Sequence, residues 1–244
     1  MKNILDLHTH TISSGHAYST LQENIQAAKL KGLKYYGMSD HAPGIPGGTH
    51  FFHFKNLEII PTEIDGVRVL RGCELNIIDE LGTVDLEKNI LEKLDYCIAS
   101  FHSPCYSSKH TLEDNMSAYK AICHNPYVHI IGHADDGRYP CDYEELAKMA
   151  KETNTLIELN NSSLRPNASR INGQENCRKI LEACKKVGCM IVLNSDAHIS
   201  FDVGRDDYST ILIEEVDFPK ELILNYNEDK LNNFIKLKDS TSKE

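Results

Sequence analysis

The chain has 244 residues, of which 41% are hydrophobic and 25% charged, enough for one large core, and α/β barrels of this length commonly form a single domain. Its formal net charge of −10 argues against a nucleic-acid partner, because such binding depends on clustered Lys and Arg. The sequence contains no signal-peptide pattern and no apolar stretch of the roughly 18 residues that a membrane span needs. We therefore expect a cytoplasmic protein without a membrane partner.

The eight cysteines contain no Cys-x-x-Cys pair. Several lie within apolar runs, where a thiol behaves as a small hydrophobic side chain. We therefore expect buried, reduced thiols and no disulfide framework.

Short apolar runs rich in β-forming residues alternate with helical patterns along the chain. The first helical pattern begins near Leu21, with Ser19 as its expected N-cap, and the last regular one ends before Gly188 as its expected C-cap. The strands are predicted over residues 4–8, 35–39, 67–74, 95–100, 128–132, 156–160 and 190–194. Further helices are predicted over residues 86–94, 112–123, 143–153 and 174–187.

This alternation predicts a parallel sheet covered by helices, and the chain length favours a closed α/β barrel over an open, doubly wound sheet. No Gly-rich dinucleotide fingerprint follows the first strand. Beyond Asp196 the pattern weakens into an apolar run at 210–214 and two short helical segments near Glu221 and Leu231. We expect one barrel domain over residues 1–237 and a disordered tail over 238–244.

Side chains that commonly bind metals recur where the predicted strands end. In a parallel barrel the carboxyl ends of the strands form one rim, so these residues would converge on a single pocket. Any one of them could instead be a hydrogen-bonded histidine or a helix cap, but their recurrence favours a shared metal site. They are His8 and His10 on the first strand, Asp40 and His41 on the second, Glu74 on the third, His102 and His133 after the fourth and fifth, and Asp196 and His198 after the seventh.

Six stretches of the chain resemble the motifs of the PHP superfamily, the polymerase and histidinol phosphatase domains. They are Asp6-Leu7-His8-Thr9-His10, Ser39-Asp40-His41, Gly72-Cys73-Glu74, Phe101-His102-Ser103, Gly132-His133 and Ser195-Asp196-Ala197-His198. The segments 16–21 and 158–163 resemble more specifically the stand-alone bacterial YcdX-type phosphatases. The resemblance implies a distorted seven-stranded barrel that holds three divalent metal ions, usually described as zinc. The chain departs from the pattern at Ala134-Asp135, where relatives often carry Pro-Gly.

Matching positions imply a ligand set for each metal ion. By this resemblance, the first ion takes His8, His10, Glu74 and Asp196; the second shares Glu74 and adds His102 and His133; and the third takes His16, His41 and His198. Nitrogen donors with a few carboxylates suit zinc, manganese or iron better than calcium or magnesium.

A carboxylate that bridges two such ions would hold them close enough to activate a water between them. The resulting hydroxide could attack a phosphorus atom in line, while the cations take up charge on the other oxygens. Glu74, Asp196 and His102 would act in catalysis through this hydroxide, and the sequence assigns no proton donor. Asp40 could orient a ligand ring or cap a helix.

Substrate contacts are expected on the same rim. The loop over residues 42–54 carries His50 and His53 among glycines, prolines and phenylalanines, and could form a lid. Arg165 and Arg170 follow the sixth strand and are the preferred candidates for binding the substrate phosphate, because a guanidinium can grip it with two hydrogen bonds. Arg138 and Arg205 are further candidates, and each of these arginines could instead form a surface salt bridge.

The sequence best supports a metal-dependent phosphatase that hydrolyses a small phosphate monoester, histidinol phosphate being one option. A phosphodiesterase or exonuclease of the same superfamily is an alternative, although it would need a basic groove. A non-catalytic metal-binding or regulatory module is another, because fold does not guarantee activity. The resemblance also suggests a homotrimer.

Overall fold

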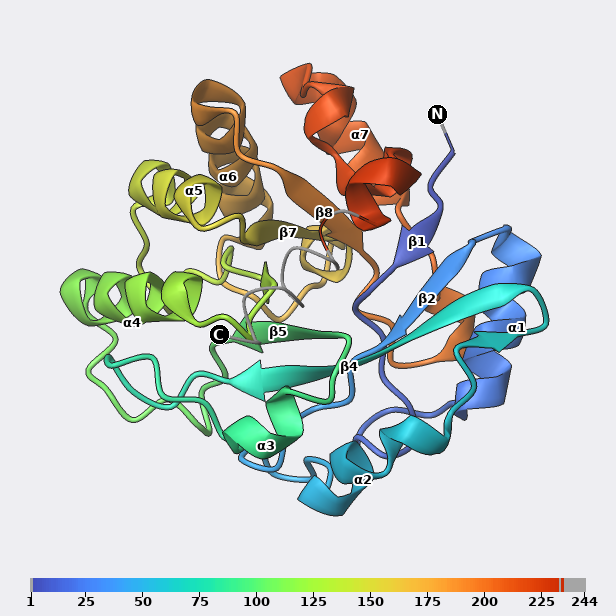
Figure 1. Cartoon of the computed structure of the whole chain (residues 1–244). Helices are drawn as coiled ribbons and strands as arrows, with labels where there is room; N and C mark the ends of the chain where they lie inside the picture. Colours follow the sequence, from blue (N-terminus) through green and yellow to red (C-terminus); the bar gives the residue numbers. More distant parts are fainter. Residues whose placement is uncertain (1, 233, 235–244) are drawn as a thin grey trace.

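A sheet of seven parallel strands forms the centre of the molecule and curls into a nearly closed barrel (Figure 1). The computed structural model describes residues 2–232 and 234. In the order of the sheet the parallel strands are β1 (Leu5–Asp6), β2 (Tyr35–Met38), β4 (Val67–Asn76), β5 (Tyr96–Ser100), β6 (Ile130–Ile131), β7 (Leu156–Asn160) and β8 (Ile191–Asn194). The first and last strands approach each other just beyond their ends, where the amide of His10 donates to Ala197 O at 2.8 Å. The predicted barrel is confirmed.

Helices surround the barrel, as Figure 1 shows. They are α1 (Leu21–Lys31), α2 (Phe51–Lys55), α3 (Lys88–Leu91), α4 (Leu112–His124), α5 (Tyr143–Glu152), α6 (Gly173–Val187) and α7 (Asp207–Val216). Gly188 ends α6 in the left-handed conformation with φ 73°, as predicted. The apolar run at 210–214 lies within α7, residues 220–222 form a 3-10 turn, and residues 228–232 are helical. The predicted tail over 238–244 lies outside the described residues.

The N-cap of α1 is Thr20, so the prediction of Ser19 was wrong. Thr20 and Glu23 form a reciprocal capping box, in which the Thr20 side chain accepts from the amide of Glu23 and the Glu23 carboxylate accepts from the amide of Thr20. Ser19 stands one position too early for this box. Its hydroxyl instead accepts from the amide of Ser200 at 2.9 Å and ties the start of α1 to the loop after β8.

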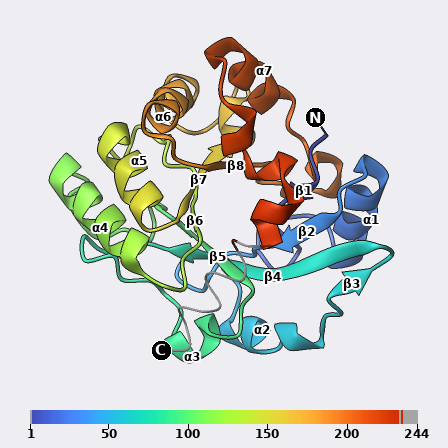
Figure 2. The same ribbon diagram turned by 45° about the horizontal axis from the view of Figure 1, so that its top comes forward.

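Two strands differ from the predicted pattern in ways that concern the site. The strand β1 ends at Asp6, so His8 and His10 lie in the segment beyond the ladder. A two-residue strand, β3 (Glu63–Ile64), pairs antiparallel with the start of β4 and was not predicted, because two residues carry no readable periodicity (Figure 2).

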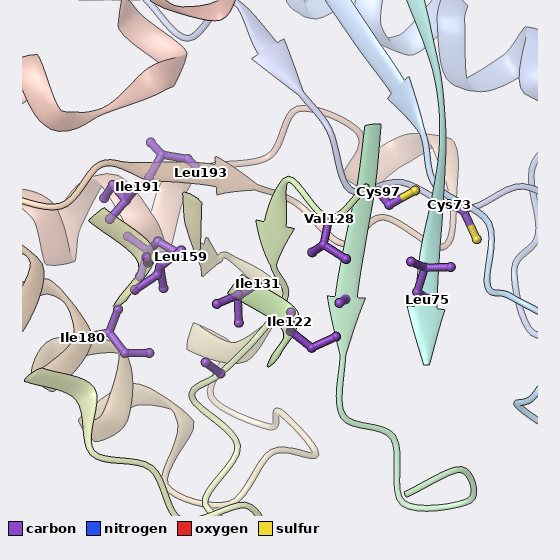
Figure 3. Close-up of a cluster of buried hydrophobic side chains, with 14 of the residues drawn as sticks. Cys73, Leu75, Cys97, Ile122, Val128, Ile131, Leu159, Ile180, Ile191 and Leu193 are labelled. Carbon is purple, nitrogen blue, oxygen red and sulfur yellow. The ribbon is translucent and has the colours of Figure 1, made fainter. Parts of the chain in front are cut away.

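The strands separate two buried layers. Along β5, Ile98 faces the barrel interior, while Cys97 on the opposite face packs toward the helices. Figure 3 shows the outer layer, where Leu159 of β7 lies near Ile180 of α6. Each fully buried side chain of this kind stabilises the fold by about 1.5–3 kcal/mol.

Tyr96 fills the barrel interior beneath the site. Its hydroxyl donates to Leu7 O at 2.5 Å, and its ring lies against Gly37 and Gly72, where a Cβ atom would meet it at less than 3 Å. Glycine is required at these two positions because the Tyr96 side chain lies too close to the backbone for a Cβ atom, and not because of turn geometry.

Replacing Gly37 with Ala should destabilise the fold by about 2–3 kcal/mol, because the new Cβ would lie 2.8 Å from Leu7 Cα and would also meet the Tyr96 hydroxyl. Chemical denaturation measures this loss. The control is Gly66→Ala, whose Cβ would meet no atom of the described residues within 4 Å but whose φ is 80°, and it should cost only about 1 kcal/mol. Equal losses in the two variants would contradict the packing argument.

The composition predicts reduced cysteines and no membrane-spanning segment. No disulfide joins the eight cysteines, all of which lie in the described part of the chain, and six of them are buried. Within residues 2–232 and 234, none of the helices combines the length and the apolar character needed to cross a membrane.

Candidate metal centre

Glu74 is the centre of a buried cluster of histidines at the carboxyl end of β4. Its side chain is fully buried, and its two oxygens face five imidazoles from four other segments. The contacts are 3.0 Å from Oε1 to His133 Nε2, 3.4 Å from Oε1 to His102 Nε2, 2.7 Å from Oε2 to His41 Nδ1, 3.3 Å from Oε2 to His8 Nε2 and 3.6 Å from Oε2 to His10 Nε2.

Asp196 supplies a second carboxylate from the loop after β8. Its Oδ1 lies 3.3 Å from His10 Nε2 and 3.6 Å from His8 Nε2. Its Oδ2 accepts from Asn160 Nδ2 at 3.1 Å and from Arg170 Nη2 at 2.8 Å. The backbone of Asp196 has φ 54°, a conformation that non-glycine residues adopt only when the surrounding contacts impose it. The loop thus holds one oxygen toward the histidines and the other toward Arg170.

Three histidines form the outer part of the cluster. His16 Nε2 lies 3.0 Å from His198 Nε2, and the His16 and His41 rings are stacked with centroids 5.0 Å apart. His10 packs beneath His41 and His198, with ring centroids 4.3 Å from each. This geometry links the outer histidines to the inner group through His10.

Hydrogen bonds fix two of the five imidazole rings that face Glu74. His8 Nδ1 lies 2.7 Å from Glu158 Oε1, and His102 Nδ1 lies 2.7 Å from Asn76 Oδ1. Both partners accept, so each Nδ1 carries the hydrogen and each Nε2 presents its lone pair to the cluster. Glu158 itself is held by the side chains of Asn160 and Asn194 and by the backbone of His133.

Asp40 was expected to orient a ligand ring or to cap a helix. Within the described residues it caps no helix, and its nearest link to a predicted ligand ring runs through Ser14 Oγ, which lies 3.5 Å from His10 Nδ1. Asp40 accepts hydrogen bonds of 2.7 Å from the amide of Thr11, from the Thr11 hydroxyl and from Ser14 Oγ. Ser14 Oγ in turn accepts from the amide of His41. Asp40 therefore stabilises the turn that carries His16, because a buried carboxylate satisfies several donors of a short loop at once.

The cluster keeps its carboxylates ionised. Burial raises the pKa of Glu74, but contact with His8 and His41 outweighs burial and holds the pKa well below its usual value. Asp196 behaves in the same way, since contact with His8 outweighs its burial. Burial lowers the pKa of His10 to about 3, assisted by the neighbouring histidines. The inner site therefore presents anionic oxygens together with a neutral imidazole lone pair.

Several of the buried atoms in the cluster have no hydrogen-bond partner among residues 2–232 and 234. They are His8 Nε2, His10 Nε2, both nitrogens of His41, and Glu74 Oε2. These atoms lie close together but are poorly oriented to bond with each other, as expected for lone pairs aimed at a common point. Three sets place their ligand atoms within 4.8 Å of one another: His8, His10 and Glu74; His10, His41 and His198; and His41, Glu74 and His102. The donor set fits borderline divalent cations.

An open pocket of about 290 Å³ exposes the outer face of the cluster. Its walls include His16, His41, Glu74, His102, His133, Asp196 and His198, together with Arg170. His8 and His10 lie behind these residues, in contact with Glu74 and Asp196. The structure thus brings the nine predicted ligands to one mouth of the barrel.

The candidate arginines lie in different settings. Arg170 lines the pocket and is bound to Asp196, to Asn160 Oδ1 at 3.3 Å and to Ser163 Oγ at 2.9 Å. Arg165 pairs with Asp202 at 2.7 Å and does not line this pocket. Arg205 is likewise held by salt bridges to two aspartates. Of these three arginines, Arg170 is therefore the best placed to contact a ligand in the pocket.

The loop over 42–54 is partly helical, because Phe51–Lys55 form α2. His50 is the N-cap of α2 and accepts from the amide of Phe52, while His53 Nε2 lies 3.4 Å from Asp40 Oδ2. Ile45 is the part of the loop that lines the pocket. The two histidines thus have structural contacts, and the lid stays a prediction.

Glu158, Asn76 and Asn160 position the predicted ligands, and none of the three was predicted to have a role in the site. The signal was present, because Asn76 follows Glu74 by two positions and Glu158 and Asn160 end β7, so all three share the inward face of their strands. Asn and Glu are less distinctive than His as metal-site residues, and only the contacts reveal that they orient the ligands.

The fold and the cluster define the class of protein: a parallel β/α barrel whose histidines and carboxylates, at the carboxyl ends of the strands, are able to hold metal ions. Residues 6–168 match the model of the PHP domain family, and the chain belongs to this family. A probable phosphatase of Clostridium novyi (strain NT) is 45% identical over 238 residues, which cover 98% of this chain and 96% of that protein. A probable phosphatase of Clostridium acetobutylicum matches with the same identity and coverage.

Solved structures share the fold at low sequence identity. The histidinol phosphate phosphatase of Lactococcus lactis subsp. lactis, complexed with zinc, L-histidinol and phosphate, is 16% identical with a TM-score of 0.60, covering 90% of this chain and 95% of that one. A structure of archaeal ribonuclease P with mature tRNA contains a chain that is 15% identical with a TM-score of 0.58, covering 97% of this chain and 91% of that one. These likenesses concern the fold.

Proposed function

We propose that the protein is a metal-dependent phosphatase that hydrolyses a small phosphate monoester. The observation that supports this most is the set of unpaired, buried ligand atoms around Glu74, at the mouth where barrel enzymes carry their active sites. The relatives named probable phosphatases support the reaction class. A neighbour of the same fold was solved with zinc and phosphate, which supports the choice of metal and of substrate class.

The proposed ligands form three groups that share their central members. His8, His10, Glu74 and Asp196 would hold one ion; Glu74, His102 and His133 a second; and His16, His41 and His198 a third. The three ions are zinc in this proposal, with manganese and iron as alternatives. The position of His10 between the inner and outer histidines supports a connected set of sites.

Bound divalent cations would supply an activated water and take up negative charge on the phosphate. The chain's own residues would prepare the site for that chemistry. Glu74 and Asp196 remain anionic in a buried place, Glu158 fixes the ring of His8, and Asn76 fixes the ring of His102. Arg170 holds Asp196 and lines the pocket, where its guanidinium would bind the phosphate.

An assay of three substrates tests this function against the alternatives. We expect hydrolysis of p-nitrophenyl phosphate, with much lower rates on bis-p-nitrophenyl phosphate and on single-stranded DNA. Faster hydrolysis of the diester or of DNA would favour the phosphodiesterase or exonuclease. No hydrolysis of any ester by metal-loaded protein, across a panel of phosphorylated metabolites, would favour the non-catalytic module.

Replacing Glu158 with Gln should weaken metal binding by about 10–100-fold, because His8 would lose the anionic partner that orients its ring and raises its basicity. Competition with a coloured chelator measures the affinity. Glu175→Gln is the control, since Glu175 lies on the surface of α6 and pairs with Lys179. Equal affinities in the Glu158 variant and the control would show that this contact does not support the site.

A further inference from the structure

A second pocket opens directly beside the metal centre. It has a volume of about 340 Å³ and shares His102, His133 and Arg170 with the pocket over the cluster. Its remaining walls include Ser103, Asp136, Arg138 and Tyr139. A phosphate ester bound at the cluster would extend its leaving group into this space, because the two pockets have common walls.

Asp136 and Arg138 form a fixed pair in this second pocket. Arg138 Nε donates to both carboxylate oxygens of Asp136, at 3.0 and 2.9 Å, and Nη2 lies 2.5 Å from Oδ2. The Asp136 side chain is 5% exposed and that of Arg138 is 40% exposed. The aspartate therefore lies beneath the guanidinium and holds it in place, while the outer edge of the guanidinium reaches the pocket.

Arg138 still has hydrogen-bond donors free for a ligand after it pairs with Asp136. A guanidinium has five N–H groups, and the contacts of Arg138 in the described chain use Nε and Nη2 on Asp136 and Nη1 on Ser103 at 3.3 Å. This leaves an N–H on each of Nη1 and Nη2 for a ligand. The Ser103 hydroxyl also lies 3.1 Å from the Tyr139 hydroxyl, so a second donor can turn toward the same space.

Among the described residues that line this pocket, Asp136 is the one carboxylate, and it is already paired. Both oxygens of Asp136 are bonded to Arg138, and Arg170 stays bound to Asp196. A positively charged leaving group would therefore meet two guanidinium groups and no carboxylate with a spare oxygen. An anionic leaving group would find a planar fork of donors that is held in position before binding.

We propose that this pocket binds a second anionic group of the substrate, a carboxylate or another phosphate, and that Arg138 is the residue that recognises it. The proposal rests on the proposed function, because it places the reacting phosphate at the neighbouring cluster. It narrows the substrate class to small phosphate esters that carry a further negative charge a few bonds from the ester oxygen. An ester with an ammonium group there, such as histidinol phosphate, is disfavoured by the same contacts.

Binding of non-hydrolysable phosphonates to the metal-loaded protein tests the proposal without turnover. The probes are 3-phosphonopropionate, 3-aminopropylphosphonate and propylphosphonate, which have similar lengths and end in a carboxylate, an ammonium group and a methyl group. Calorimetry should give the carboxylate about 10- to 100-fold tighter binding than the ammonium probe, the range expected for hydrogen bonds between charged groups. Methylenediphosphonate in the same experiment shows whether a second phosphate is preferred to a carboxylate.

Variants of Arg138 assign the preference to this residue. Arg138→Gln should remove most of the preference for the carboxylate probe, and Arg138→Lys should retain only part of it, because lysine keeps the charge without the fork. Arg178→Gln is the matched control: Arg178 pairs with Glu215 on the surface and lines neither pocket beside the cluster. Thermal unfolding of each variant shows whether the fold is retained.

Equal affinity for the three probes in the unchanged protein would overturn the proposal, as would a preference that survives Arg138→Gln. Hydrolysis of p-nitrophenyl phosphate is measured in parallel and keeps the two questions apart. If this ester is hydrolysed but the probes bind equally, the subsite is refuted and the phosphatase stands. If neither this ester nor any member of the panel of phosphorylated metabolites is hydrolysed and the probes still differ, the subsite stands and the reaction class is refuted.

Discussion

Replacing Glu74 with Gln should remove most of the bound metal and reduce phosphatase turnover on the order of 10³-fold. The substitution preserves the size of the side chain but converts one oxygen into an amide nitrogen that cannot ligate. Five imidazoles face the two oxygens of Glu74, so removing the carboxylate affects the histidines around both oxygens at once. A metal ion contributes several kcal/mol to the transition state of phosphoryl transfer, which corresponds to a loss of this size.

Elemental analysis and steady-state kinetics measure these two effects of the Glu74 substitution. Glu63→Gln is a matched control, because Glu63 lies exposed on β3 and the same chemical change there should alter neither metal content nor rate. A Glu74→Gln variant that keeps full metal content and full turnover would refute the central role of this carboxylate.

Chelation should abolish hydrolysis of p-nitrophenyl phosphate and lower the thermal unfolding midpoint. Without cations, the carboxylates of Glu74 and Asp196 stay buried beside imidazole nitrogens for which the described residues offer no hydrogen-bond partner, and the cluster loses the positive charge that compensates them. A ligand present at 100 times its dissociation constant stabilises a fold by about 2.7 kcal/mol, and this contribution disappears with the metal. Scanning calorimetry and the aryl phosphate assay, each before and after dialysis against a chelator, measure the two effects.

Adding metals back to the chelated protein provides the control for the chelator itself. Zinc, manganese or iron should restore activity, whereas calcium should not, because it prefers sites made of oxygen alone. Full activity in protein from which elemental analysis finds all metal removed would contradict the proposed chemistry.

The fold could be predicted from the sequence because the relevant signals are repeated. All seven parallel strands coincide with apolar runs, and the regular helices coincide with helical spacing. What could not be predicted depends on contacts. The two-residue β3 carries no periodicity. Thr20 and not Ser19 caps α1 because Glu23 stands three positions after Thr20, and because the Ser19 hydroxyl accepts a hydrogen bond from the amide of Ser200.

The candidate site could be predicted as a set of residues but not as a set of interactions. Histidines at strand ends are a recognisable pattern, and their gathering around Glu74 follows from the parallel barrel. The partners of charged residues are not encoded in local spacing. Arg165 and Arg170 are five positions apart in one loop, yet one pairs with Asp202 and the other with Asp196 in the pocket wall.

Anomalous X-ray diffraction from crystals of the purified protein, recorded at the zinc, iron and manganese edges, would locate the metal ions. We expect three ions at the carboxyl mouth of the barrel. His8, His10 and Asp196 would hold one, His102 and His133 the second, and His16, His41 and His198 the third, with Glu74 as a further ligand of the first two. Crystals of metal-supplemented protein that show no anomalous density at this cluster, or density only at other sites, would contradict the proposed metal centre.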